Sequence, residues 1–354
     1  IGGWEQLTVA QETLPGAARA QLAFTSLKGE KYTAIGTSQG LFLYYGEAFY
    51  DITPLDTAIT GATFDTFASQ NNVTVNKVGH GLEVGRYVTF TSVSPPAGYI
   101  ASDFTTGAFE ILTVPDADTF TIQMRVNAGS AASASGSASI NPYVIVGPTI
   151  QTTGYGWGTY LWSDSTWGTE RATSNVTLDP GNWSLDNFGE VLVATIFNGK
   201  TFTWDAGATN PRTVRASTTT SGFSTSANPT ASRFTLVSDR DRHLFHFGTE
   251  TNIGAPSSQD PMFVRFSNQE DLNTYLPKAT NTAGTFRLDT GNKITAALQG
   301  KDYIFVLTDS AAYVIQFVGP PFTFSVRQVG THCGCIAQHA ASYVNGAVYW
   351  MSSE

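Results

Sequence analysis

Charged side chains are scarce in this sequence. Asp, Glu, Lys and Arg together make up 13% of its 354 residues, roughly half of the usual share. Because few charges leave little polar surface to keep a monomer apart from its neighbours, we expect the chain to assemble with other proteins. Its net charge is −9, and the densest basic run, Arg240 and Arg242, is interrupted by Asp239 and Asp241. The missing basic patch argues against binding to nucleic acid through its phosphates.

Long apolar runs are also lacking, so no membrane-spanning helix is expected. The first residues, 1–5, do not resemble a signal peptide and include no initiator Met. The last residues, 349–354, stop beside a strand-like run. We therefore expect the chain to be a piece of a longer protein.

Cysteine is nearly absent, with Cys333 and Cys335 as its two examples. A disulfide between residues this close in sequence would be strained. His332 and His339 lie nearby, so a zinc site is an alternative to two free thiols. Zinc is usually held by four ligands supplied as two spaced pairs, and this spacing does not match that pattern. We favour free thiols.

Recognisable catalytic motifs are missing too: the chain contains no nucleophile elbow, phosphate loop or dinucleotide fingerprint. His80 lies between two glycines and is expected to be part of a turn. His243 and His246 fall three apart in a strand-like run, which would point them to opposite faces. Asp239, Asp241 and Asp260 are expected in loops. The sequence thus predicts no enzyme, with no catalytic residue, no cofactor-binding residue, no metal ligand and no cofactor.

The residues that are abundant favour β structure. Aromatics make up 12% of the chain, Gly occurs 34 times and Thr and Ser are frequent, a mixture that fits pleated sheets and tight turns. Short apolar runs joined by turn residues predict hairpins. In one, Val191–Ile196 is followed by Asn198-Gly199, Thr201–Trp204 and an extended run at Pro211–Arg215. Similar hairpins are expected at 32–45 and 303–317, and incomplete ones at 243–247 and 347–350.

These units recur at intervals of about 40 to 60 residues, the period of propeller blades built from four-stranded sheets. We predict an all-β chain with a β-propeller-like body. A series of β-sandwiches is the competing architecture.

One stretch breaks the rhythm and predicts an inserted module. Strand-like alternation at 87–90 and 120–122 favours a small β-barrel or sandwich. The run 128–139, nearly all Ala, Ser and Gly, is interpreted as a linker or a weak edge strand. The expected organisation is body at 1–69, inserted module at 70–141 and body again at 142–354.

The inserted module resembles a small β-module of phage virion proteins, named after the catalytic-cysteine half-domain of ubiquitin-activating enzymes. The resemblance rests on His80–Val88, Gly107–Ile111 and Asp116–Ile122. It implies a scaffold and carries no catalytic residue.

The remainder resembles the propeller proteins that form the hub or nozzle of short-tailed phages. That resemblance rests on Gly2-Gly3-Trp4, Tyr32–Tyr50, Gly154–Gly158, Trp162, Trp167-Gly168, Asn182–Gly189 and Phe266-Ser267-Asn268. It implies a structural virion protein of the phage tail, forming a homo-oligomeric ring, six-fold by this resemblance. Its implied partners are adaptor, portal or fibre proteins, and genomic DNA that passes through the ring without sequence-specific binding. The alternative is a receptor- or carbohydrate-binding tail spike or adhesin.

Overall fold

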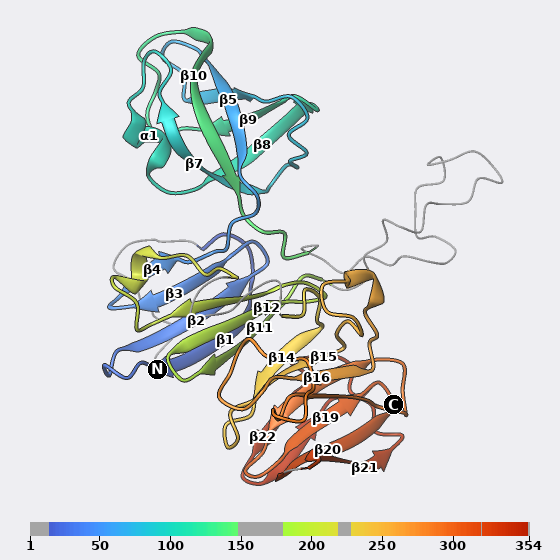
Figure 1. The fold of residues 1–354 in the computed structure, drawn as a ribbon. Coiled ribbons are helices and arrows are strands. Elements are labelled where there is room, and N and C mark those ends of the chain that lie inside the picture. Colours follow the sequence, from blue (N-terminus) through green and yellow to red (C-terminus); the bar gives the residue numbers. More distant parts are fainter. Residues whose placement is uncertain (1–13, 148–179, 219–227, 320, 353–354) are drawn as a thin grey trace, which may run out of the picture. The chain divides into compact units, whose positions relative to one another are not determined.

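The computed structural model describes residues 14–147, 180–218, 228–319 and 321–352, and its regular structure is almost entirely β. The all-β prediction is confirmed. Contacts divide the chain into two compact units (Figure 1). The body comprises Ile1–Ser38, Phe42–Ile52 and Val146–Glu354, and the barrel unit comprises Gln39–Leu41 and Thr53–Ile145. No helix among the described residues is long and apolar enough to cross a membrane.

The body is a succession of antiparallel sheets whose strands are neighbours in chain order. The first sheet holds β1 (Ala18–Thr25), β2 (Lys31–Thr37), β3 (Leu41–Tyr45) and β4 (Ala48–Asp51). The second holds β11 (Trp183–Phe188), β12 (Val191–Ile196) and β13 (Thr201–Asp205). The third holds β14 (Phe234–Val237), β15 (Leu244–Phe247), β16 (Phe263–Phe266) and β17 (Gly284–Arg287). The fourth holds β18 (Ile294–Gln299), β19 (Ile304–Thr308), β20 (Ala311–Gly319) and β21 (Thr323–Thr331), and the fifth holds β22 (Ala341–Val344) and β23 (Ala347–Trp350).

The first strands of these sheets lie beside one another. β1 contacts β11, β11 contacts β14, β14 contacts β18 and β18 contacts β22. Later strands of each sheet then follow in order from the first (Figure 1). Inner strands in series, each followed by hairpin-linked outer strands, are the arrangement of propeller blades, in agreement with the predicted propeller-like body. The hairpins predicted at 32–45, 191–204 and 303–317 are formed by β2–β3, β12–β13 and β19–β20.

Aromatic side chains fill the space between the third and fourth sheets. Phe245, Phe247 and Val264 are fully buried there. The Phe245 ring meets the Phe324 ring edge-on, with 4.9 Å between their centres, a geometry that aromatic pairs prefer. Because successive strand residues face opposite ways, the other face of β15 is left to Leu244 and His246.

The barrel unit is a closed six-stranded barrel with the order β10-β5-β6-β9-β8-β7. Its strands are β5 (Ile59–Thr66), β6 (Asn72–Asn76), β7 (Tyr87–Ser94), β8 (Phe109–Asp116), β9 (Thr119–Gln123) and β10 (Ala132–Pro142), and a short helix, α1 (Ala101–Thr105), lies between β7 and β8. The fully buried rings of Phe64 and Phe104 lie 4.6 Å apart in its core. Closure leaves no unpaired sheet edge.

Two features of the barrel unit differ from the sequence expectation. The barrel begins at β5 rather than near residue 70, because β5 pairs with both β6 and β10 and is needed for closure. The Ala/Ser/Gly run expected to be a linker or a weak edge strand forms most of β10, which pairs with β5 and β7. Small side chains are no obstacle there, since backbone hydrogen bonds on both sides fix the strand.

A third difference concerns the run after β13. Pro211–Thr213 forms a 3-10 turn, η2, rather than an extended strand. Proline is favoured at the first helical position, and the Trp204 Nε1–H donates to the carbonyls of Pro211 and Val214, at 3.0 and 3.1 Å. The buried indole therefore holds the turn.

We expect the body to fold without the barrel. Leu55 and Tyr143 form an antiparallel bridge, and the Asp56 amide donates to the Pro142 carbonyl at 2.8 Å, so the two connecting segments are adjacent. Replacing residues 58–141 by a short Gly-Ser bridge should leave a β-rich chain that unfolds in one cooperative transition, measured by circular dichroism. Complete loss of cooperative unfolding would contradict the insertion.

A second prediction concerns Asp186 on β11. Its carboxylate accepts the amides of Val237 and Asn187 at 2.6 and 2.8 Å, but burial raises its pKa from 3.8 to about 6, and nearby Asp239 adds to the rise. Because the folded-state pKa lies above the unfolded value, Asp186 lowers stability as pH rises from about 4 through about 6.

The stability of Asp186→Asn relative to the natural chain should therefore be higher at pH 7 than at pH 4, because the amide carries no charge, although its single acceptor oxygen can serve only one of the two backbone amides. Urea unfolding at both pH values measures the difference. An equal effect at the two pH values would show that the buried charge is not the cause.

Candidate binding site

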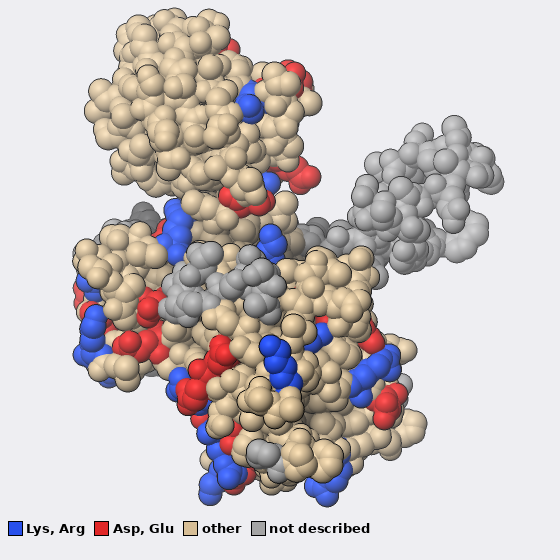
Figure 2. All heavy atoms as spheres, viewed as in Figure 1, with Lys and Arg blue, Asp and Glu red and all other residues tan. Residues whose placement is uncertain are grey.

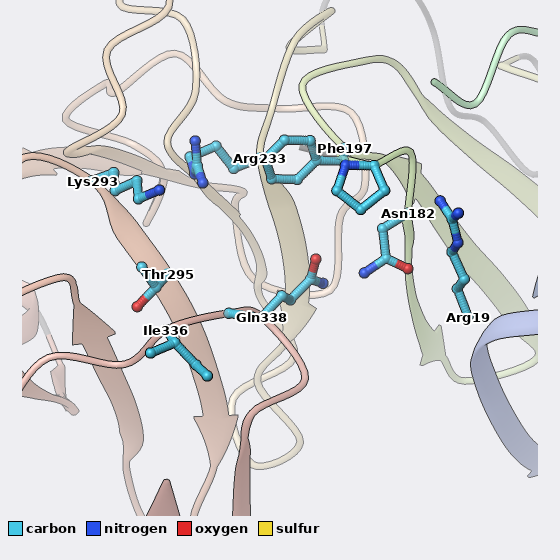
Figure 3. Close-up of a pocket in the computed structure, with 10 residues that line it drawn as sticks. Arg19, Asn182, Phe197, Arg233, Lys293, Thr295, Ile336 and Gln338 are labelled. Atoms are coloured by element: carbon cyan, nitrogen blue, oxygen red, sulfur yellow. The ribbon is translucent and has the colours of Figure 1, made fainter. Parts of the chain in front are cut away.

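A pocket of about 260 Å³ opens where the first strands of the sheets begin. Figure 3 shows its side chains coming from strands that are far apart in sequence. We call it the first-strand pocket, and its lining consists of Arg19, Pro180, Asn182, Phe197, Arg233, Lys293, Thr295, Ile336, Ala337 and Gln338. The first four sheets contribute residues that lie in a strand or next to one. Residues 336–338 come from the segment before β22 of the fifth sheet.

Three of the lining side chains are cations, and two of them are held by hydrogen bonds to backbone carbonyls. The Arg19 guanidinium donates to the Gly181 carbonyl. Arg233 donates through Nε to the Ile294 carbonyl at 3.0 Å, and its guanidinium carbon lies 4.7 Å from the centre of the Phe197 ring, a cation–π distance. Lys293 directly precedes β18 and is half-buried. Three cations from three sheets thus face one cavity in a chain of net charge −9.

The chemistry of this lining suits an anion. Arg presents flat pairs of donors to a carboxylate or phosphate, and Lys adds a compact charge. Asn182, Thr295 and Gln338 add neutral donors and acceptors. Among the described residues that line the pocket there is no Asp, Glu, His, Cys, Ser or Tyr. The described lining therefore offers charge and hydrogen bonds, but no carboxylate or imidazole that could act as a general base for Thr295 or Lys293.

The histidines singled out in the sequence lie away from this pocket. His246 is fully buried, with Nδ1 at 2.9 Å from Ser232 Oγ and Nε2 at 3.1 Å from Tyr275 OH. Burial, together with the charge of Arg265, lowers its pKa to about 3. The ring is therefore neutral at pH 7, and it links β15 to Ser232, which is also fully buried, and to Tyr275.

His243 faces other partners. Its Nε2 lies 3.1 Å from Thr282 Oγ1, its ring meets Phe324, and burial lowers its pKa to about 4. His243 and His246 are thus not brought together, as their spacing predicted. His80 is buried in its turn, where its Nδ1 accepts the Leu82 amide at 2.9 Å.

The two cysteines are free and pack into a small apolar cluster with Ala296, Leu307 and Ala312. Burial raises the pKa of Cys333, which disfavours the thiolate form that metals bind. Over the residues that the structure describes, no three His, Cys, Asp or Glu side chains are placed to hold a metal ion.

The loop carboxylates are engaged in separate contacts. Asp260 accepts from Arg287 Nε at 2.7 Å, and Asp241 lies 3.9 Å from Arg240. Sequence reasoning missed the first-strand pocket, because Arg19, Arg233 and Lys293 belong to no common motif. Of the segments that carry the resemblance to phage tail proteins, 2–4, 154–158, 162 and 167–168 lie outside the described residues.

Comparison with known proteins adds little. No family model matches the chain, and no curated protein matches it. Among solved structures it is similar to one described as phage phi92 endosialidase, with 14% sequence identity and a TM-score of 0.28. The match covers 91% of this chain and 50% of that chain, so the chain spans about half the length of the structure it matches. At this TM-score the likeness assigns neither a fold family nor an activity.

Proposed function

We propose that this chain is a structural component of a bacteriophage tail that acts by binding and assembly rather than by catalysis. The observation that carries the proposal is the first-strand pocket, where Arg19, Arg233 and Lys293 converge without an acid–base pair among the described lining residues. Such a site retains an acidic group of a partner and does not transform it. The placement in a phage tail rests on the sequence resemblance to hub and nozzle proteins.

The surface of the barrel unit supports a role in assembly. Between residues 53 and 145 the sequence has three basic and seven acidic side chains, and Figure 2 shows few charges over the barrel on the face in view. Val78, Ile100 and Ile145 are 79%, 64% and 63% exposed. Apolar side chains on a weakly charged surface favour protein contacts. Candidate partners are other copies of the chain and the adaptor, portal or fibre proteins of a tail.

The assembly that we propose is a ring around a DNA channel. A charge of −9 per chain, repeated around a ring, would make the field in an enclosed channel strongly negative. Phosphates would be repelled from the wall, so DNA could slide without capture.

A receptor-binding adhesin is the second candidate, and the first-strand pocket favours it. Host-surface glycans often carry acidic groups, and a small cationic cavity with neutral hydrogen-bonding side chains can retain one. In both candidates the pocket recognises an anion. They differ in whether the anion belongs to a tail protein or to the host surface.

The pocket can be tested with citrate as an anionic probe. We expect citrate to bind, and Lys293→Gln to weaken binding about fivefold, the effect of losing one partly screened charge interaction. Lys301→Gln is the matched control, because Lys301 is exposed and does not line the pocket. Isothermal titration calorimetry measures both. Equal affinities for the two variants would remove the pocket from the proposal.

The ring makes a separate prediction. Electron microscopy of the assembled particle should show a cyclic assembly, six-fold by resemblance, with an axial channel whose wall is mainly acidic or neutral. A three-fold spike without an axial channel would favour the adhesin, and a channel lined mainly by Lys and Arg would contradict DNA passage by repulsion.

A further inference from the structure

A second cavity lies against the third sheet of the body, and it shares no lining residue with the first-strand pocket. Its volume is about 680 Å³, within the range typical of ligand pockets. We call it the β16 pocket. Its floor is formed by Phe263 and Arg265 of β16 and Thr285 of β17, and its walls are residues 251–253 and 273–278. Phe263 and Arg265 are two residues apart and so face the same way, and Arg265 is paired with Thr285 across the strands.

Arg265 makes this floor unusual, because a cation that is only 4% exposed is rare in a protein interior. Its guanidinium donates to the Thr251 carbonyl at 2.8 Å and to the Tyr275 carbonyl at 3.4 Å. These bonds tie both walls to the floor and preform the cavity. The Nε–H is buried and has no hydrogen-bond partner among the described residues, so the guanidinium serves mainly to hold the walls in place.

The remaining lining combines a flat apolar face with neutral polar groups. The Phe263 ring is half-buried, and the Arg265 guanidinium carbon lies 5.5 Å from its centre. Asn252 and Thr274 contribute amide and hydroxyl groups, and Lys278 is exposed at the rim. Both charged side chains in the described lining are cations.

We propose that the β16 pocket binds a saccharide that carries a carboxylate. A sugar ring has an apolar face of C–H groups that fits against an aromatic ring, and an edge of hydroxyls that pairs with amides and hydroxyls. The carboxylate is matched by Lys278 at the rim, while the charge of Arg265 in the floor is partly offset by the buried carboxylate of Glu250. The site is separate from the anion site proposed above and does not depend on it.

The test compares two trisaccharides of the same size, trigalacturonic acid and neutral maltotriose, by isothermal titration calorimetry on the full chain. Trigalacturonic acid should bind measurably and maltotriose at least tenfold more weakly. Thr285→Tyr places a large side chain over the floor and should abolish binding, and tyrosine is well tolerated in a strand. Lys278→Gln should weaken binding of the acid about fivefold.

Two controls separate this site from the rest of the protein. Lys301→Gln, which alters neither pocket, should leave trigalacturonic acid binding unchanged, and Lys293→Gln, which alters the first-strand pocket, should weaken it less than Lys278→Gln does. Binding that is lost in Lys293→Gln but kept in Lys278→Gln would overturn the assignment to this cavity. Absence of binding, or equal binding of maltotriose, would overturn the ligand class. If Thr285→Tyr fails to fold by circular dichroism, the Lys278→Gln result decides.

Discussion

The close packing of Trp183 against Gly36 is the contact on which the body depends. A β-carbon at Gly36 would lie 2.7 Å from the Trp183 side chain, so only glycine lets β2 and β11 approach this closely. The buried indole donates through Nε1 to the Thr37 carbonyl at 2.9 Å. This contact fixes where β11 begins relative to the first sheet. Asn182 precedes Trp183 by one residue, so its place in the first-strand pocket follows from the same contact.

Buried hydroxyls continue this ordering from the second sheet to the third. Thr195 Oγ1 lies 2.8 Å from Thr235 Oγ1, and Ser184 Oγ donates to the Thr235 carbonyl at 2.7 Å. These groups are buried, and each has a partner, so their desolvation is compensated. Arg233 lies two residues before Thr235. The hydrogen bonds that hold Thr235 against the second sheet therefore also fix the position of Arg233 in the first-strand pocket.

Local patterns predicted the hairpins but not the features that depend on distant strands. β12–β13 was predictable because two apolar runs flank an Asn-Gly turn. β10 was not, since its Ala/Ser/Gly composition is that of a linker and its strand state comes from pairing with β5 and β7. The first-strand pocket was hidden for a similar reason: Arg19, Arg233 and Lys293 belong to different sheets, and only the series of first-strand contacts brings them together.

Anion binding in the cationic pockets is compatible with a net negative charge that repels DNA. Electrostatic binding to a duplex needs many Lys and Arg side chains set against successive phosphates, whereas the first-strand pocket is a cavity of about 260 Å³, far too small to admit a double helix. At physiological salt, exposed charges are screened beyond roughly 8 Å. A long polyanion passing over the surface would therefore meet mainly the net negative charge. A small acidic group that enters a pocket would meet the cations at short range, where screening is weak. In the ring that we propose, the same chain would thus retain a single acidic group while nucleic acid passes.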